Sequence, residues 1–134
     1  MTRRLKTMGL AIALIWMALS PAYAADTKCA ECGMTVRMAS PFTAKITQGD
    51  TRLFFCDIGD LFVYLRKKGL NNARAEVKDY PTGAWVDARK AAYVHAEKKF
   101  RTPMGWGIAA FKNADDASRS GAIMYFDNMA KALK

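Results

Sequence analysis

The sequence predicts an α+β protein that folds as one small compact domain built from two β-β-α-β repeats. Several short runs of apolar or alternating residues, separated by turns that contain glycine or proline, are typical of strands. Two further stretches begin with a helix-capping Asp or Asn and end at a glycine, which is typical of short helices. Residues 54–60 and 110–116 are weakly similar, since each runs from a strand through a cap into a helix. This similarity indicates two copies of one motif.

The first 24 residues are predicted to be a secretory signal peptide. Three basic residues are followed by an apolar run over residues 8–19 and by Ala22-Tyr23-Ala24, a small-x-small cleavage site. The apolar run is short for a membrane span, and an uncleaved anchor is the alternative interpretation. Cleavage would leave a domain of residues 25–134, or 110 residues. No lipoprotein-type triplet precedes Cys29, so we expect a periplasmic protein without a lipid anchor.

Composition limits the classes of function that need to be considered. The formal charge is +9, and it falls to +6 without the three basic residues of the leader. A positive charge suits docking to an acidic partner or to an anionic membrane surface. Nucleic acid is not expected as a partner of an exported protein that has no basic motif with interleaved aromatic residues. The chain has one histidine, His95, and no glycine-rich phosphate loop, so the sequence does not predict an enzyme.

The first repeat is expected over about residues 40–80, after an extended N-terminal arm at residues 25–38. Strands at 42–47 and 52–56 flank a Gln-Gly-Asp turn and form a hairpin. Asp57 caps a helix over residues 58–68, which has basic residues in its last turn and stops at Gly69. A third strand is expected over residues 75–80.

The second repeat is expected over about residues 84–126. A short apolar stretch at 84–88 is followed by a strand at 91–96 and a basic loop at 97–103. A strand at 108–112 then leads to Asn113, which is expected to cap a short helix through Ser120. A last strand at 123–126 and a basic helix from Asp127 complete the chain.

The stretch from Cys29 to Met34, Cys-Ala-Glu-Cys-Gly-Met, is the main candidate for chemistry. Two thiols and a thioether within six residues are soft donors, which select Cu(I), Zn²⁺ or iron–sulfur centres. A C-x-x-C pair can also be a redox dithiol or a structural disulfide. Met34 favours Cu(I), because a thioether is a better ligand for Cu(I) than for Zn²⁺. Gly33 allows the sharp turn that would let the sulfurs converge.

Two further sulfur residues are candidate ligands. Cys56 ends the predicted hairpin and is either a third thiolate or a buried, inert cysteine. Met104 lies between Pro103 and Gly105 in a stiff turn, where its thioether would be presented rather than packed. With three cysteines in an oxidising compartment, the alternative to a metal site is one disulfide and one spare thiol. His95 is interpreted as a surface residue.

Five motifs taken together resemble the NosL family, the periplasmic copper chaperones of nitrous-oxide reductase maturation. The motifs are Cys29 to Met34, Phe54 to Asp57, Trp85 to Ala88, Ala92 to Val94 and Thr102 to Gly105. The resemblance covers nearly all of residues 25–134 and implies a tandem β-β-α-β fold with a Cu(I) site of sulfur donors. The sequence departs from the family pattern in two ways. It lacks a lipidated cysteine, and Trp106, rather than a histidine, follows Pro-Met-Gly.

The resulting hypothesis is a Cu(I)-binding metallochaperone with Cys29, Cys32, Met34, Cys56 and Met104 as candidate ligands. The resemblance implies that its partner is apo nitrous-oxide reductase or another copper acceptor, together with a membrane assembly complex. Two chains that share one Cu(I) would form a homodimer, which the sequence leaves open. The rival hypotheses are a periplasmic thiol–disulfide protein and an interaction module held by structural zinc or a disulfide.

Overall fold

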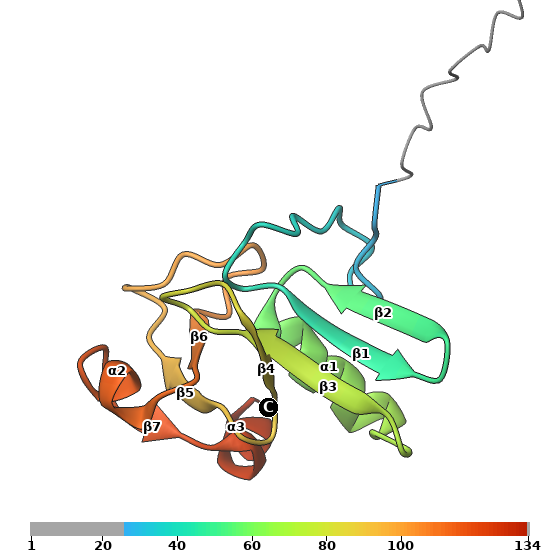
Figure 1. Cartoon of the computed structure of the whole chain (residues 1–134). Coiled ribbons are helices and arrows are strands. Elements are labelled where there is room, and N and C mark those ends of the chain that lie inside the picture. The colour runs from blue at the N-terminus through green and yellow to red at the C-terminus, as the bar shows by residue number, and fades with distance from the viewer. Residues whose placement is uncertain (1–25, 134) are drawn as a thin grey trace, which may run out of the picture.

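The computed structural model describes residues 26–133, which contain seven strands and three helices. Figure 1 shows their arrangement. The predicted signal peptide lies outside these residues. In chain order the elements are β1 Ala44–Gln48, β2 Thr51–Phe55, α1 Ile58–Lys68, β3 Arg74–Lys78, β4 Trp85–Asp87, β5 Ala92–His95, β6 Ile108–Phe111, α2 Ala114–Ser118, β7 Ile123–Met124 and α3 Phe126–Ala132. Within residues 26–133, none of the helices has the length and apolar character that a membrane crossing requires.

The strands form two antiparallel sheets that repeat one topology. The first sheet has the order β2-β1-β3-β4 and the second has the order β6-β5-β7. In each unit the first strand lies in the middle, between its hairpin partner and the strand that follows the helix. This arrangement confirms the predicted α+β fold of tandem β-β-α-β units. β4 is an additional strand at the edge of the first sheet, where it pairs with β3.

Helix α1 begins and ends where its sequence predicts. The side chain of Asp57 accepts a hydrogen bond from the backbone N–H of Gly59, with Oδ1 and N 3.1 Å apart. Basic residues occupy the last turn, and Gly69 ends the helix with φ of 70°, a conformation that glycine adopts without strain. The helix contacts β1 and β2 of the first unit as well as β6 and α3 of the second. It therefore connects the two units through packing.

The N-terminal segment corrects one expectation, because residues 26–38, the described part of the arm expected at 25–38, are not extended. The part described folds back on itself: Lys28 bridges Thr35, and Cys29 pairs in parallel with Phe54 of β2. Gly33 has φ of 78°, which permits the reversal, and the Cys29 N–H donates to the Met34 carbonyl at 2.8 Å. Cys29 and Val36 are 4% and 5% exposed and belong to the core. Burial of these side chains favours the folded turn over an extended arm.

Candidate metal centre

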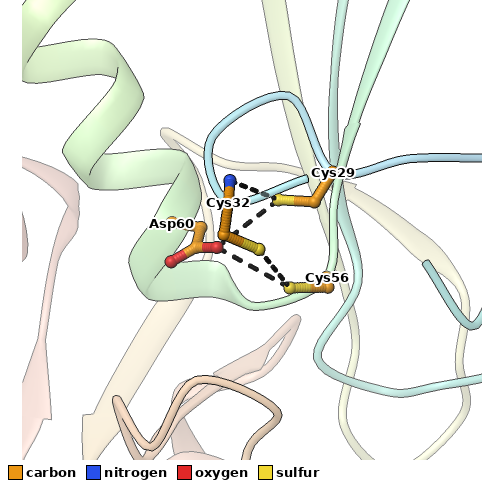
Figure 2. A group of neighbouring side chains, drawn as sticks. All are labelled: Cys29, Cys32, Cys56 and Asp60. Atoms are coloured by element: carbon orange, nitrogen blue, oxygen red, sulfur yellow. Dashed lines mark hydrogen bonds between the residues drawn. The ribbon is translucent and has the colours of Figure 1, made fainter. Parts of the chain in front are cut away.

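Four side chains from two separate parts of the chain meet at one point beside α1. The ligand atoms of Cys29, Cys32, Cys56 and Asp60 all lie within 4.8 Å of one another. Figure 2 shows the three sulfurs and the carboxylate pointing toward a common centre. Three thiols and one carboxylate offer four donors, a number that suits a small metal ion.

The first two cysteines are positioned by the folded N-terminal turn. The Ala30 N–H donates to the Phe54 carbonyl at 2.9 Å, which fastens the turn to β2. The Gly33 N–H donates to the Cys29 carbonyl at 3.0 Å and closes the turn. The Cys32 N–H approaches the Cys29 sulfur at 3.5 Å. These backbone contacts hold both thiols on the side of the turn that faces α1 (Figure 2).

The other two residues come from the β2–α1 junction. Cys56 lies between the last residue of β2 and the cap of α1, and Asp60 lies in the first turn of α1. Cys56 directly precedes Asp57, the N-cap of α1, so the chain brings it beside the first turn of the helix. The Cys56 sulfur and the Asp60 carboxylate oxygen Oδ2 are consequently 3.6 Å apart.

The three cysteines carry free thiols that bond to one another and to the carboxylate. Cys29 Sγ donates to Asp60 Oδ2 at 3.4 Å, and the sulfurs of Cys32 and Cys56 are also 3.4 Å apart. Burial raises the pKa of Cys32 to about 11 and moves the pKa of Cys56 well above the ordinary thiol value. Both thiols are therefore protonated near neutral pH, and a metal ion has to displace their protons.

Asp60 is the residue that the sequence interpretation missed. Its side chain is buried, with 3% of the residue exposed, and it accepts a hydrogen bond from the indole nitrogen of Trp106 at 2.9 Å. A Cβ on Gly59 would lie 2.0 Å from the Trp106 ring, so glycine is what allows the ring to reach the carboxylate. The signal in the sequence was the spacing Cys56-x-x-x-Asp60 across a helix cap.

The two methionine candidates have exposed side chains. Met34 is 49% exposed and contributes its carbonyl oxygen, rather than its sulfur, to the turn. Met104 is 42% exposed, and its backbone N–H donates to Asp57 Oδ2 at 2.9 Å. That bond places the Pro-Met-Gly loop beside the start of α1. Both sulfurs thus belong to exposed side chains, and Met34 and Met104 stay predicted ligands.

An open cleft reaches one side of the cluster. It has a volume of about 630 Å³, and Cys56 and Met34 are among the residues that line it. Arg37 and Arg101 also line it, on the N-terminal segment and on the loop before Pro103. His95 lies elsewhere on the surface, with Nε2 3.6 Å from the Glu97 carboxylate. The structure thus gives the cluster a route to solvent that does not involve the only histidine.

Fold and cluster together define a small α+β protein with a candidate sulfur-rich metal centre. The NosL family model matches residues 21–133, and the chain belongs to the NosL family. Its fold is similar to the crystal structure of the copper chaperone NosL from Shewanella denitrificans, with a TM-score of 0.66 and 24% sequence identity. The match covers 83% of this chain and 96% of that chain. A search of curated proteins found no significant match.

Proposed function

We propose that this protein binds Cu(I) in the periplasm and delivers it to nitrous-oxide reductase or to another copper enzyme. The observation that carries the proposal is the convergence of three thiols on one point beside an open cleft. Thiolates are soft, anionic donors, and Cu(I) is the soft ion that accepts them in low coordination numbers. Membership of the NosL family and the copper chaperone of similar fold support the same cargo.

The exposed thioethers support a role in transfer rather than in storage. A chaperone needs a site that holds copper tightly and yet exchanges it with an acceptor. Met34 and Cys56 both line the cleft, so a thioether at the cleft wall lies on the route by which copper enters or leaves. Met104, on the loop that Asp57 holds, is a second exposed thioether beside the same helix end. We infer that these methionines act as transient ligands while thiolates hold the resting ion.

The partner is inferred from family membership and from charge. The positive chain suits an acidic face on apo nitrous-oxide reductase or on its membrane assembly complex. A predicted signal peptide would bring the protein into the compartment where such an acceptor matures. Two copies of this chain could also share one Cu(I), which would join them as a homodimer.

A structural zinc site is the second candidate, and Asp60 is the observation that favours it. Three cysteines and one aspartate supply the four ligands of a closed tetrahedral zinc site. A structural site contributes folding free energy, so chelation would unfold the domain. We expect the opposite, because most of the core residues come from the two sheets and α1, and the four side chains contribute only Cys29 and Cys56 to it. Circular dichroism of the chelated protein distinguishes the two sites.

The direct test is an anaerobic titration of the reduced mature protein with Cu(I) against a chromogenic chelator, followed by native mass spectrometry. One copper per chain is expected. Cys29→Ser and Cys56→Ser should each weaken Cu(I) binding by more than about 100-fold. Loss of a residue that only supports a ligand costs at most about 100-fold in metal affinity, so a larger effect indicates a ligand. Unchanged affinity in both variants would refute the proposal.

Transfer is tested with the methionines. Met34→Ala should leave the affinity nearly unchanged but slow the loss of copper to apo nitrous-oxide reductase, measured as the copper content of the re-isolated reductase over time. Met38→Ala is the matched control, because Met38 is 42% exposed on the same segment and does not line the cleft. Equal transfer rates for the two variants would remove Met34 from the route.

A further inference from the structure

The three thiols are not equivalent in their contacts. Cys32 and Cys56 form the sulfur–sulfur contact, at 3.4 Å, whereas the Cys29 sulfur donates to the Asp60 carboxylate. The Cys29 sulfur also accepts the Cys32 N–H. The pair nearest in sequence, Cys29 and Cys32, is therefore not the pair whose sulfurs are in hydrogen-bond contact (Figure 2).

Access to solvent separates the thiols in a second way. Cys29 and Cys56 are 4% and 2% exposed, while Cys32 is only partly buried. A reagent from solvent meets Cys32 first. Cys56 borders the cleft but is only 2% exposed, so it offers a reagent little surface, while its sulfur is within reach of the Cys32 sulfur.

We propose that the metal-free protein forms a disulfide between Cys32 and Cys56, with Cys32 as the thiol that reacts first and Cys29 left reduced. The oxidant is a disulfide, of a small molecule or of an exchange protein. Cys32 attacks one sulfur of that disulfide and breaks its S–S bond, which releases one thiol that carries the proton from Cys32. Cys56 then attacks the Cys32 sulfur, breaks the mixed disulfide and releases the second thiol. Two electrons pass from the protein to the oxidant.

Formation of this bond is compatible with the fold and would disable the metal centre. The sulfurs have to approach only from 3.4 Å to about 2.05 Å, the length of an S–S bond. The bond would tie the turn at Cys32 to the start of α1 at Cys56. It would also remove two of three thiolates, so the oxidised protein should hold no copper. This disulfide needs only the metal-free geometry, and its test does not depend on the cargo.

The test is disulfide mapping of the wild-type protein. The reduced, metal-free protein is treated with oxidised glutathione, alkylated in acid and digested with trypsin without reduction. Cleavage after Lys28, Arg37, Arg52 and Arg66 gives peptide 29–37, with two cysteines, and peptide 53–66, with Cys56. We expect these peptides to be cross-linked, and fragmentation should place the link at Cys32 and the alkyl group at Cys29. A disulfide inside peptide 29–37, a Cys29–Cys56 link or three alkylated cysteines would each overturn the proposal.

Two variants test the order of the steps. Cys56→Ser removes the second nucleophile, so glutathione should remain attached to Cys32 as a stable mixed disulfide, which the wild-type protein does not accumulate. Cys29→Ser is the matched control and should form the cross-link to the same extent as wild type. Loss of the cross-link in Cys29→Ser, or glutathione on another cysteine in Cys56→Ser, would contradict the assigned roles. A copper-loaded sample should resist oxidation if the same thiols bind the metal.

Discussion

At the scale of single residues, the carboxylate of Asp60 organises the centre. It is buried, and three donors reach it: the Trp106 indole N–H and the thiols of Cys29 and Cys56. Burial of a carboxylate is costly unless hydrogen bonds compensate for lost water. The indole N–H is the shortest of the three contacts, at 2.9 Å, and it fixes Oδ1 while Oδ2 faces the thiols. Trp106 therefore positions Asp60 from outside the sulfur cluster.

Trp106→Phe tests this positioning. Phenylalanine keeps a six-membered aromatic ring but lacks the N–H, so a buried carboxylate oxygen becomes unpaired, which should lower the free energy of unfolding by roughly 1–3 kcal/mol. Urea denaturation measures the change. Trp85→Phe is the control, because Trp85 lies on edge strand β4 and its ring faces the Lys45 ammonium rather than a buried acceptor. An equal loss in both variants would show that ring size, not the hydrogen bond, matters.

The raised thiol pKa values predict how copper binding depends on pH. The folded apo protein holds protons on Cys32 and Cys56 throughout the neutral range, since burial raises the pKa of both. Binding of Cu(I) to thiolates releases these protons, so the apparent affinity should rise with pH, by about tenfold per pH unit for each proton released. Competition titrations at several pH values, corrected for the chelator alone, measure the slope. In Cys32→Ser one proton fewer is released on binding, so the affinity should rise by a factor about tenfold smaller per pH unit. An affinity that does not depend on pH would exclude thiolate ligands.

At the scale of elements, Asp57 joins helix α1 to the Pro-Met-Gly loop. One carboxylate oxygen caps the helix through the Gly59 N–H, and the other accepts the Met104 N–H at 2.9 Å. The side chain is fully buried, and burial raises its pKa. One residue thus determines where the helix starts and where the exposed thioether of Met104 is held.

Asp57→Asn separates these two roles. Asparagine caps helices as well as aspartate does, but its amide nitrogen is a donor and cannot accept the Met104 N–H. We expect an intact α1 together with faster hydrogen exchange at the Met104 amide, measured by NMR. In Asp57→Ala the cap is lost as well, at a cost of about 1 kcal/mol of stability. Unchanged exchange at Met104 in the asparagine variant would show that the loop is held by other contacts.

At the scale of the whole molecule, Asp79 forms a polar connection between the two units. It follows β3 and bridges Ala110 of β6, and its Oδ1 accepts the Lys112 N–H at 2.8 Å. The Tyr80 N–H donates to the Ala110 carbonyl at the same distance. Asp79 is 5% exposed, so its bonds are shielded from water. The two sheets are consequently held in a definite register by backbone and side-chain bonds, in addition to apolar packing around α1.

Asp79→Ala should weaken this connection. Loss of the buried carboxylate leaves the Lys112 N–H without its acceptor, and we expect the free energy of unfolding to fall by about 2 kcal/mol. Asp50→Ala, in the exposed β1–β2 turn, is the matched control and should change stability by less than about 0.5 kcal/mol. Denaturant titration followed by circular dichroism gives both values. A larger loss in the control would contradict the assignment.

Local patterns in the chain predicted most of the elements. Helix α1 matches its predicted range because a cap, an apolar face and a C-terminal glycine act within a few residues of one another. Strand β7 is shorter than predicted, with two residues, and α3 begins at Phe126 rather than Asp127. Such ends depend on pairing with distant strands, which short-range patterns do not encode. Short-range patterns also placed residues 84–88 in the second repeat, whereas β4 pairs with β3 of the first sheet.

The sequence by itself determined the family, the paired architecture and the sulfur-rich character of the candidate site, because these follow from residue types and short spacings. Only the tertiary structure decided which side chains meet. It folded the N-terminal segment onto β2 and placed Cys56 against Cys32. It also brought the Asp60 carboxylate into hydrogen-bond contact with Trp106, which lies 46 residues further along the chain. The physical reason is that such contacts arise from burial and strand pairing between distant segments, and no spacing within one segment specifies them.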